Sequence, residues 1–139
     1  MLSERDRRGI QDRLKQMEGP VKLVNFTQEL ECPTCRETGQ LLQELSGLSE
    51  KLSLEVYNFQ LDKQQVSQYQ IDKIPATVVA GVKDYGIRFY GLPAGYEFAT
   101  LLEDILAVSR GKSALSPATI ERLRTLDRPL HLQVFVTPT

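Results

Sequence analysis

The chain of 139 residues is long enough for one ordinary domain with a hydrophobic core. Its 41% hydrophobic and 25% charged residues are typical of a globular protein, and 17 basic against 18 acidic residues leave a net charge of -1. This balance excludes the basic footprint of a nucleic-acid-binding protein, and no apolar stretch is long enough to span a bilayer. The charged segment 1–8 lacks the apolar region of a signal peptide, which favours a soluble, cytoplasmic protein.

The first half of the chain is predicted to alternate helices and strands. Ser3 can cap a first helix, whose apolar residues recur at helical spacing until a Gly-Pro pair ends it. Segment 21–26 alternates and is rich in β-formers, so it predicts a strand. A polar loop follows, then a helix whose first turn suits Pro33, and then a second strand at 54–59.

The second half adds a different unit. A short polar helix is expected at 62–69, a strand at 76–80, a hairpin partner at 87–90, and an amphipathic helix that contains Phe98 and ends at Gly111. An early βαβ unit is therefore followed by a ββα unit. This order predicts an α/β fold with a mixed central sheet of about four strands and helices on both faces.

The last part of the chain repeats the order with which the chain opens. A helix is predicted at 116–127, followed by a proline break and an apolar strand at 130–136. We expect residues 1–112 to form one complete unit and residues 113–139 to be the opening helix and strand of a second unit that continues beyond Thr139. Since a lone apolar strand exposes unpaired backbone groups along both edges, this strand is also a candidate for self-association.

The two cysteines of the chain, Cys32 and Cys35, lie where the first strand leads into a helix. The thiolate is the nucleophile in disulfide exchange, and an ordinary cysteine is only ~3% ionised at neutral pH. A helix amino terminus favours the anion through its unpaired amides and its dipole. The spacing places the second thiol one turn along the helix. We therefore predict a redox pair in which Cys32 attacks and Cys35, one turn inside, resolves the mixed disulfide.

Two other interpretations of this pair stay open at this stage. The cysteines can be half of a metal site or two structural thiols. A structural zinc site needs four ligands, and the one further soft ligand, His131, lies about a hundred residues away along the chain. Redox chemistry without a bound metal is therefore favoured.

Ile74-Pro75 stands immediately before the strand at 76–80. Proline has no amide to donate, so one interpretation is a simple proline at the start of a strand. The other is a cis-proline facing the dithiol, which would leave the backbone of Ile74 free to pair with an extended substrate segment. We count Ile74 and Pro75, together with Pro33 and Thr34 between the cysteines, as candidate substrate-binding residues.

Several motifs together resemble the thioredoxin and glutaredoxin superfamily, namely 21–26, Cys32-Pro33-Thr34-Cys35 and 69–77. More narrowly, segments 89–98 and 102–105 resemble the glutaredoxin-like protein disulfide oxidoreductases. That family joins two thioredoxin-fold units in one chain, each normally with its own CxxC motif. The resemblance implies a thioredoxin fold, exchange of disulfides through the two cysteines, and Pro75 as the cis-proline.

The chain departs from these families in two places. Thioredoxins carry a buried aspartate below the dithiol, where this chain has Asn25, one residue out of register. An amide cannot accept a proton, so deprotonation of Cys35 has to rely on water or another group. Thr34 stands where many glutaredoxins have an aromatic residue, and no glutathione-binding set can be matched, so dependence on glutathione is not expected.

The resemblance predicts an enzyme that reduces, oxidises or isomerises the disulfides of client proteins without a bound cofactor. Electrons would come from a partner such as a flavin-dependent thioredoxin reductase, or pass to a client such as a peroxiredoxin. One alternative is an electron-relay domain of a flavin-dependent peroxide reductase system. Another is a non-catalytic interaction module with a thioredoxin fold.

Overall fold

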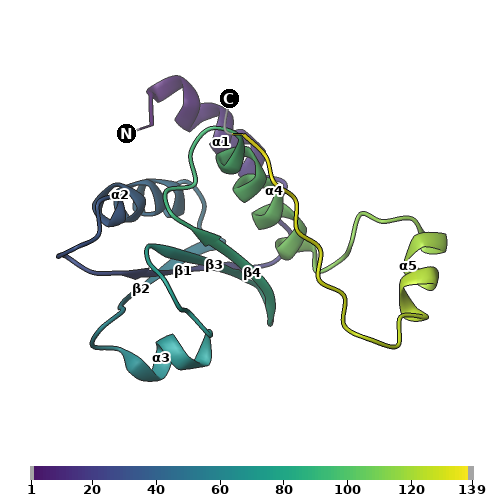
Figure 1. The fold of residues 1–139 in the computed structure, drawn as a ribbon. Helices are drawn as coiled ribbons and strands as arrows, with labels where there is room; N and C mark the ends of the chain where they lie inside the picture. The colour runs from purple at the N-terminus through teal and green to yellow at the C-terminus, as the bar shows by residue number, and fades with distance from the viewer. Residues whose placement is uncertain (1, 138–139) are drawn as a thin grey trace.

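The computed structural model describes residues 2–137. Four helices pack around one β-sheet, and a short helix near the carboxyl terminus stands apart from this body (Figure 1). In chain order the elements are α1 (Glu4–Leu14), β1 (Val21–Thr27), α2 (Cys35–Ser46), β2 (Leu52–Asn58), α3 (Lys63–Gln68), β3 (Ala76–Ala80), β4 (Asp84–Tyr90), α4 (Tyr96–Arg110) and α5 (Pro117–Arg124).

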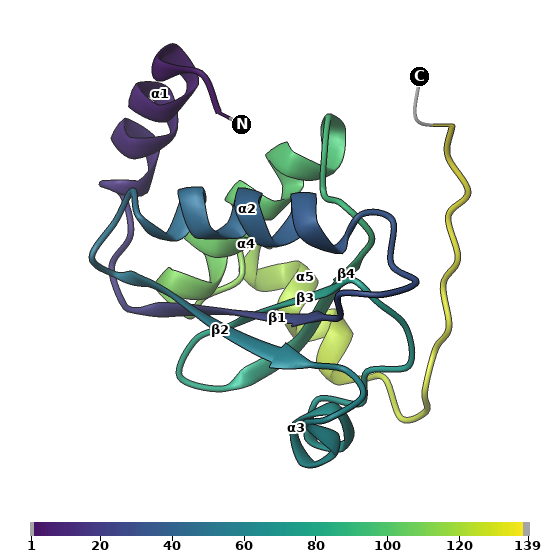
Figure 2. The same ribbon diagram turned by 90° about the vertical axis from the view of Figure 1, so that its left-hand side faces the viewer.

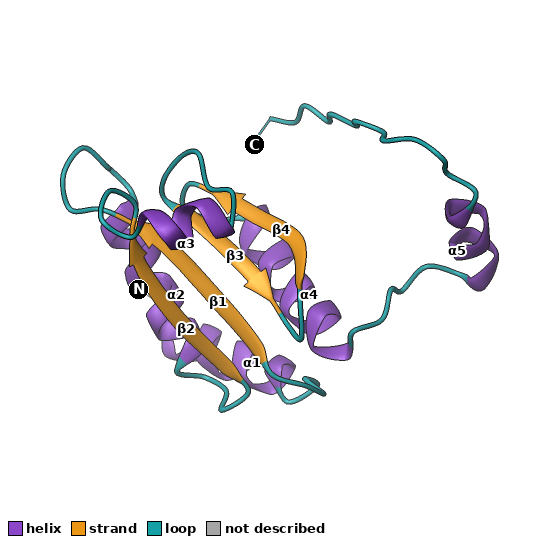
Figure 3. Ribbon diagram, turned by 90° about the horizontal axis from the view of Figure 1, so that it is seen from below, coloured by secondary structure: helices purple, strands orange, loops and turns teal. Residues whose placement is uncertain are grey.

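The sheet has four strands in the order β2-β1-β3-β4. β1 runs parallel to β2 and antiparallel to β3, which in turn pairs antiparallel with β4. α1, α2 and α4 cover one face of the sheet, and α3 lies against the other (Figures 1 and 3). The predicted α/β class, with a mixed sheet of four strands and helices on both faces, is confirmed.

Alternate residues of β1 separate two hydrophobic clusters. Val21 and Leu23 pack with residues of α1, α2 and α4, whereas Val24 and Phe26 pack on the face covered by α3. Because β1 has a neighbouring strand on each edge and helices over each face, most of its side chains are buried. This central strand leads directly into the loop that carries Cys32, so the loop starts from a rigid, buried part of the fold.

Local side-chain chemistry sets several helix ends where the sequence predicts them. The Oγ of Ser3 accepts a hydrogen bond from the amide of Asp6 at 3.1 Å and caps α1. α4 ends at Gly111, whose φ of 63° lies in the left-handed region that favours glycine. These ends depend only on neighbouring residues, which is why the sequence alone reveals them.

The starts of α2 and β4 differ from the prediction. α2 begins at Cys35 and not at Pro33, because the amide of Cys35 bonds to the carbonyl of Cys32 at 3.4 Å and closes a turn ahead of the helix. β4 begins at Asp84, earlier than residue 87, because a register shift between Val79 and Ala80 places Asp84 opposite Ala80.

The carboxyl-terminal part contains the predicted helix without the predicted strand. α5 is capped by Ser116, whose Oγ accepts a hydrogen bond from the amide of Thr119 at 3.2 Å, and it ends at Arg124, earlier than the expected residue 127. The strand expected at 130–136 is not formed, and this prediction was wrong. The segment runs exposed and clear of the sheet (Figure 2). A strand exists only beside a partner, and no strand of the described residues lies next to it.

None of the described helices is both long enough and apolar enough to cross a membrane.

Candidate active site

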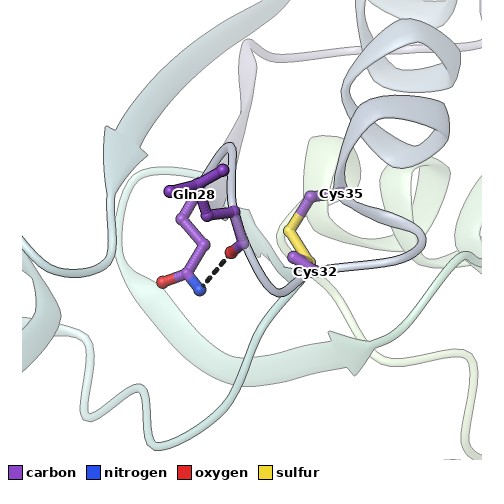
Figure 4. The surroundings of a disulfide bond; sticks show 4 residues. Gln28, Cys32 and Cys35 are labelled. Carbon is purple, nitrogen blue, oxygen red and sulfur yellow. Dashed lines mark hydrogen bonds between the residues drawn. A yellow bond between two sulfur atoms is a disulfide. The ribbon is translucent and has the colours of Figure 1, made fainter.

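Cys32 and Cys35 form a disulfide whose Cα atoms lie 5.4 Å apart (Figure 4). Cys35 is the first residue of α2 and is 2% exposed, whereas Cys32 lies in the preceding turn and is partly exposed. The first hydrogen bond beyond this turn joins the amide of Thr38 to the carbonyl of Thr34 at 2.9 Å. The structure therefore brings the two predicted cysteines together, one partly exposed and one buried.

The loop between β1 and the disulfide is held by its own side chains. Nε2 of Gln28 donates a hydrogen bond to the carbonyl of Leu30 at 2.6 Å (Figure 4). Glu31, immediately before Cys32, has a φ of 56°. This is a left-handed backbone conformation that residues other than glycine rarely adopt. Such outliers concentrate at functional sites, where the surrounding structure imposes them.

A buried polar cluster, consisting of Asn25, Thr38 and Thr77, lies between α2 and the sheet. Asn25 is 1% exposed and pairs across the ladder with Thr77, which is 0% exposed. A Cβ at Gly39 of α2 would lie 3.6 Å from Nδ2 of Asn25, so the amide reaches the helix backbone. None of the side-chain polar atoms of this cluster has a hydrogen-bond partner among the described residues.

A groove connects this cluster to the inner cysteine. Asn25 and Cys35 both line it, and Arg36 is the charged residue among its lining side chains. No carboxylate of the described residues lines the groove, so no acidic side chain on this side can accept the proton of the Cys35 thiol. The sequence singled out Asn25 but missed Thr38 and Thr77. Thr38 could have been found from the sequence, because it lies three residues after Cys35 and therefore on the same face of α2.

Charges of both signs surround the outer cysteine. The hollow that Cys32 borders is also lined by Glu29, Arg36 and Asp62. Arg36 lies in the first turn of α2, where the helix dipole also favours an anion. The two acidic side chains oppose both effects.

The Ile74–Pro75 peptide bond is cis, as predicted. Pro75 is buried, and its carbonyl accepts a hydrogen bond from the amide of Gly91 at 2.9 Å. The next residue, Ala76, pairs with Phe26 near the end of β1, so this proline lies at the end of the sheet from which the Cys32 loop departs. Of the other candidate substrate-binding residues, Ile74 and Thr34 are half-buried and Pro33 is exposed.

The side chains that could bind a metal were compared across the described residues. No group of three or more His, Cys, Asp or Glu residues within residues 2–137 is arranged to hold a metal ion. His131 is exposed in the extended carboxyl-terminal segment.

No family model matches the sequence. The crystal structure of a protein disulfide oxidoreductase from Aeropyrum pernix K1 superimposes with a TM-score of 0.80 and 32% identity. It covers 91% of this chain, and the match spans 56% of that structure's chain. The chain has the thioredoxin fold of this structure and places a Cys-x-x-Cys disulfide in it. The predicted resemblance to this family, as an amino-terminal unit, is confirmed, and the two cysteines for which we predicted thiol–disulfide exchange form a Cys-x-x-Cys disulfide.

Other relatives of this chain extend the comparison. The F component of alkyl hydroperoxide reductase from Staphylococcus aureus (strain Mu50 / ATCC 700699) is 27% identical over 140 residues, which is 100% of this chain and 25% of the relative. The chain thus spans about a quarter of the length of the curated relatives it matches.

Two further structures bear on the fold alone. The NTD_N/C domain of alkylhydroperoxide reductase AhpF from Enterococcus faecalis (V583) has a TM-score of 0.78 and 22% identity, over 88% of this chain and 60% of its own. Fasciola hepatica thioredoxin has a TM-score of 0.52 and 18% identity, over 73% of this chain and 92% of its own.

Proposed function

We propose that this oxidoreductase exchanges disulfides with client proteins, with Cys32 as the attacking thiol and Cys35 as the resolving thiol. The observation that carries this assignment is the difference in exposure between them, since Cys35 is 2% exposed and Cys32 is partly exposed. A client cannot reach a buried sulfur atom, and the thiolate at the mouth of a helix is the better nucleophile.

Each step of this exchange balances. The Cys32 thiolate attacks one sulfur atom of a client disulfide, so that a mixed disulfide forms and the other client sulfur leaves as a thiolate that takes up a proton. Cys35 then loses its proton and attacks the Cys32 sulfur, which releases the second client thiol. The client gains two electrons and two protons, and the enzyme ends with the disulfide present in this structure.

The test is reduction of insulin by the protein in the presence of dithiothreitol. We expect Cys32→Ser to lower turnover to the uncatalysed rate, because no attacking thiol is left. Cys35→Ser should retain a reactive thiol and accumulate mixed disulfides with the client, visible on a non-reducing gel. Faster alkylation of Cys35 than of Cys32 in the reduced protein near neutral pH would contradict the assignment.

We propose that the client segment docks beside the dithiol on Ile74, Pro75, Pro33 and Thr34. No backbone hydrogen bond joins Ile74 to another described residue, so its amide and carbonyl are free to pair with an extended segment. A peptide that carries the client cysteine would lie across this edge, with its sulfur atom toward Cys32. Binding of such a peptide should shift the backbone amide resonances of these residues, except for the two prolines.

We propose that the electrons come from a flavin-dependent reductase of the thioredoxin reductase type and pass to a peroxiredoxin. The identity with the F component of alkyl hydroperoxide reductase over the whole chain supports this placement, and a cytoplasmic location would keep the pair reducible. In a coupled assay, NADPH oxidation should require the reductase, this protein and a peroxiredoxin with its peroxide. Reduction of insulin without any transfer to the peroxiredoxin would favour a general disulfide reductase over a peroxide relay.

We propose that residues 113–139 open a second thioredoxin-like unit, after a first unit formed by residues 1–112. The Aeropyrum protein supports this, because the match covers only 56% of its chain, and so does the extended apolar path of residues 130–136. A second CxxC motif encoded shortly after Thr139 would support the proposal, and a stop codon there would refute it. Association of isolated copies through 130–136 would appear as a concentration-dependent mass in sedimentation.

A further inference from the structure

Arg88 of β4 is tied into the fold by its entire guanidinium group. Its side chain is 15% exposed, and all five of its N–H donors are used. Nη1 and Nη2 bond to Oδ1 and Oδ2 of Asp84 at 2.8 and 2.5 Å, and Nη1 also bonds to the carbonyl of Ile87 at 3.0 Å. Nε and Nη2 both donate to the carbonyl of Tyr69, at 3.2 and 3.1 Å. The guanidinium also lies 5.8 Å from the centre of the Tyr69 ring.

The paired carboxylate keeps this arrangement charged over the physiological range. The Arg88 guanidinium, by its hydrogen bonds, lowers the pKa of Asp84 below its ordinary value, and the amide of Gly86 adds to this effect. Asp84 in turn raises the pKa of Arg88. A planar, bidentate pair of this kind fixes orientation as well as charge, which a lysine cannot do.

The carbonyl that Arg88 holds belongs to the start of the loop that carries the cis-proline. α3 has no buried residue, so the helix contributes little packing of its own. The chain leaves it through Tyr69 and Gln70, whose φ is 54°, and continues through residues 71–73 to Ile74. The left-handed conformation of Gln70 costs free energy because this residue is not glycine. The chain at this point therefore needs a fixed hydrogen-bond partner to hold it in place.

β4 therefore anchors this loop at both ends. Arg88 holds the carbonyl of Tyr69 at the beginning, and the amide of Gly91 holds the carbonyl of Pro75 at the end. The rings of Tyr69 and Phe26 pack edge to face at 5.7 Å and add an apolar contact at the first anchor. Between the anchors, Ile74 has no backbone hydrogen bond to another described residue, and its side chain packs against the apolar cluster that contains Tyr69, so its backbone orientation depends on the two anchors and on this packing.

We propose that Arg88 is a positioning residue for protein substrates: by clamping Tyr69, it holds the backbone of Ile74 in the orientation that a client segment needs for docking beside Cys32. This inference rests on the proposed docking of the client at Ile74. A loosened loop has to be ordered again when the client binds, and that entropy cost weakens binding. A small disulfide that does not dock on the loop avoids this cost.

The experiment compares a protein disulfide with a small disulfide in Arg88→Lys. Lysine retains the charge but loses the planar fork to Asp84 and Tyr69. We expect the KM for insulin to rise about 5- to 10-fold, the ratio that corresponds to the loss of one or two net hydrogen bonds. The kcat and the rate with 5,5′-dithiobis(2-nitrobenzoic acid) should stay within about twofold of the unmodified protein, because the cysteines are untouched.

A matched control is Arg124→Lys in α5. Arg124 also forms an arginine–carboxylate pair, with Glu121 at 3.0 Å, but this pair is exposed and distant in sequence from the loop. It should leave the KM for insulin unchanged. A second variant, Asp84→Asn, keeps the bonds to Tyr69 while removing the charge that orients the guanidinium. It should give a smaller rise in KM and faster exchange of the Ile71 amide, which bonds to the carbonyl of Val66.

The outcomes separate this inference from the proposed function. A KM for insulin unchanged in both Arg88→Lys and Asp84→Asn would overturn the positioning role, and so would a parallel loss of activity toward both disulfides. If Arg88→Lys does not fold, the KM of Asp84→Asn for insulin, compared with its rate toward the small disulfide, decides alone. If the unmodified protein reduces the small disulfide but not insulin, the proposed docking of protein clients fails, whatever the variants do.

Discussion

Asn25 lies at the centre of the sheet beneath the disulfide, where its amide stays neutral at every working pH. Its side chain is 1% exposed and shares its surroundings with Thr38 and Thr77. Beside a cysteine that must lose a proton during exchange, this cluster offers polarity without a charge. A carboxylate at the position of Asn25 would add a second titrating group beside the cysteine that loses its proton.

This neutrality makes Asn25→Asp a sharp test. Burial should raise the pKa of the introduced carboxyl above its ordinary value near 3.9, because its charged form loses hydration. The folded state then holds the proton to higher pH than the unfolded state. The variant should therefore keep its stability below about pH 4 and lose about 1–3 kcal/mol as pH rises through the folded pKa. Urea unfolding at about pH 3.5 and about pH 8 measures this difference.

Asn58→Asp provides the control for this variant. Oδ1 of Asn58 accepts hydrogen bonds from the amides of Gln60 and Leu61 at 2.9 and 3.0 Å, and an aspartate can accept both. Asn58 is only half-buried, so its replacement should lower the free energy of unfolding less as pH rises than Asn25→Asp does, with repulsion from Asp62, which accepts a hydrogen bond from the amide of residue 58 at 2.6 Å, as the remaining contribution. Equal pH dependence in the two variants would show that burial at Asn25 is not the cause.

At the level of single elements, two glycines that look alike in the sequence have opposite surroundings. A Cβ at Gly81 in the β3–β4 hairpin would lie 2.8 Å from Cγ1 of Val108 and 3.3 Å from its carbonyl oxygen. Gly9 lies inside α1, where an added Cβ would meet nothing within 4 Å. We expect Gly81→Ala to cost about 1–3 kcal/mol through overpacking, and Gly9→Ala to gain about 0.5–1 kcal/mol through helix propensity. Thermal unfolding of both variants checks the signs.

α4 carries a carboxyl group in an unfavourable place. Burial raises the pKa of Asp104 above its ordinary value. A raised carboxyl pKa means that the folded state binds the proton more tightly, so its stability falls as pH rises through the folded pKa. Asp104→Asn should therefore raise the free energy of unfolding at about pH 7, by less than about 1 kcal/mol, and leave it unchanged near about pH 3. A larger gain under the acidic condition than under the neutral one would contradict this account.

For the molecule as a whole, we expect the carboxyl-terminal segment to add little to the stability of the body. Its large apolar side chains are exposed, among them Leu132 at 88% and Phe135 at 89%. The hydrogen bonds of α5 and its flanks all join residues within that segment. Removal of residues 113–139 should leave both the urea midpoint and insulin turnover unchanged. A loss of more than about 1 kcal/mol would reveal packing against the first unit.

Features that depend on neighbours along the chain could be predicted from the order of the residues alone. Hydrophobic periodicity predicted the order of helices and strands, Ser3 predicted the start of α1, and the spacing of Cys32 and Cys35 predicted the disulfide. Pro75 before β3, considered beside the CxxC motif, indicated the cis bond. These signals are local because caps, turns and amphipathic faces are set within a few residues.

Contacts between residues far apart in the chain became known from the folded structure alone. Thr77 joins Asn25 because β3 and β1 are paired in one register, and Arg88 meets the carbonyl of Tyr69, 19 residues away, because β4 passes the end of α3. The same reasoning explains why segment 130–136 was wrongly predicted as a strand. Its pattern fits a strand, but a strand requires a partner with free backbone groups, and partners are supplied by the fold and not by the segment itself.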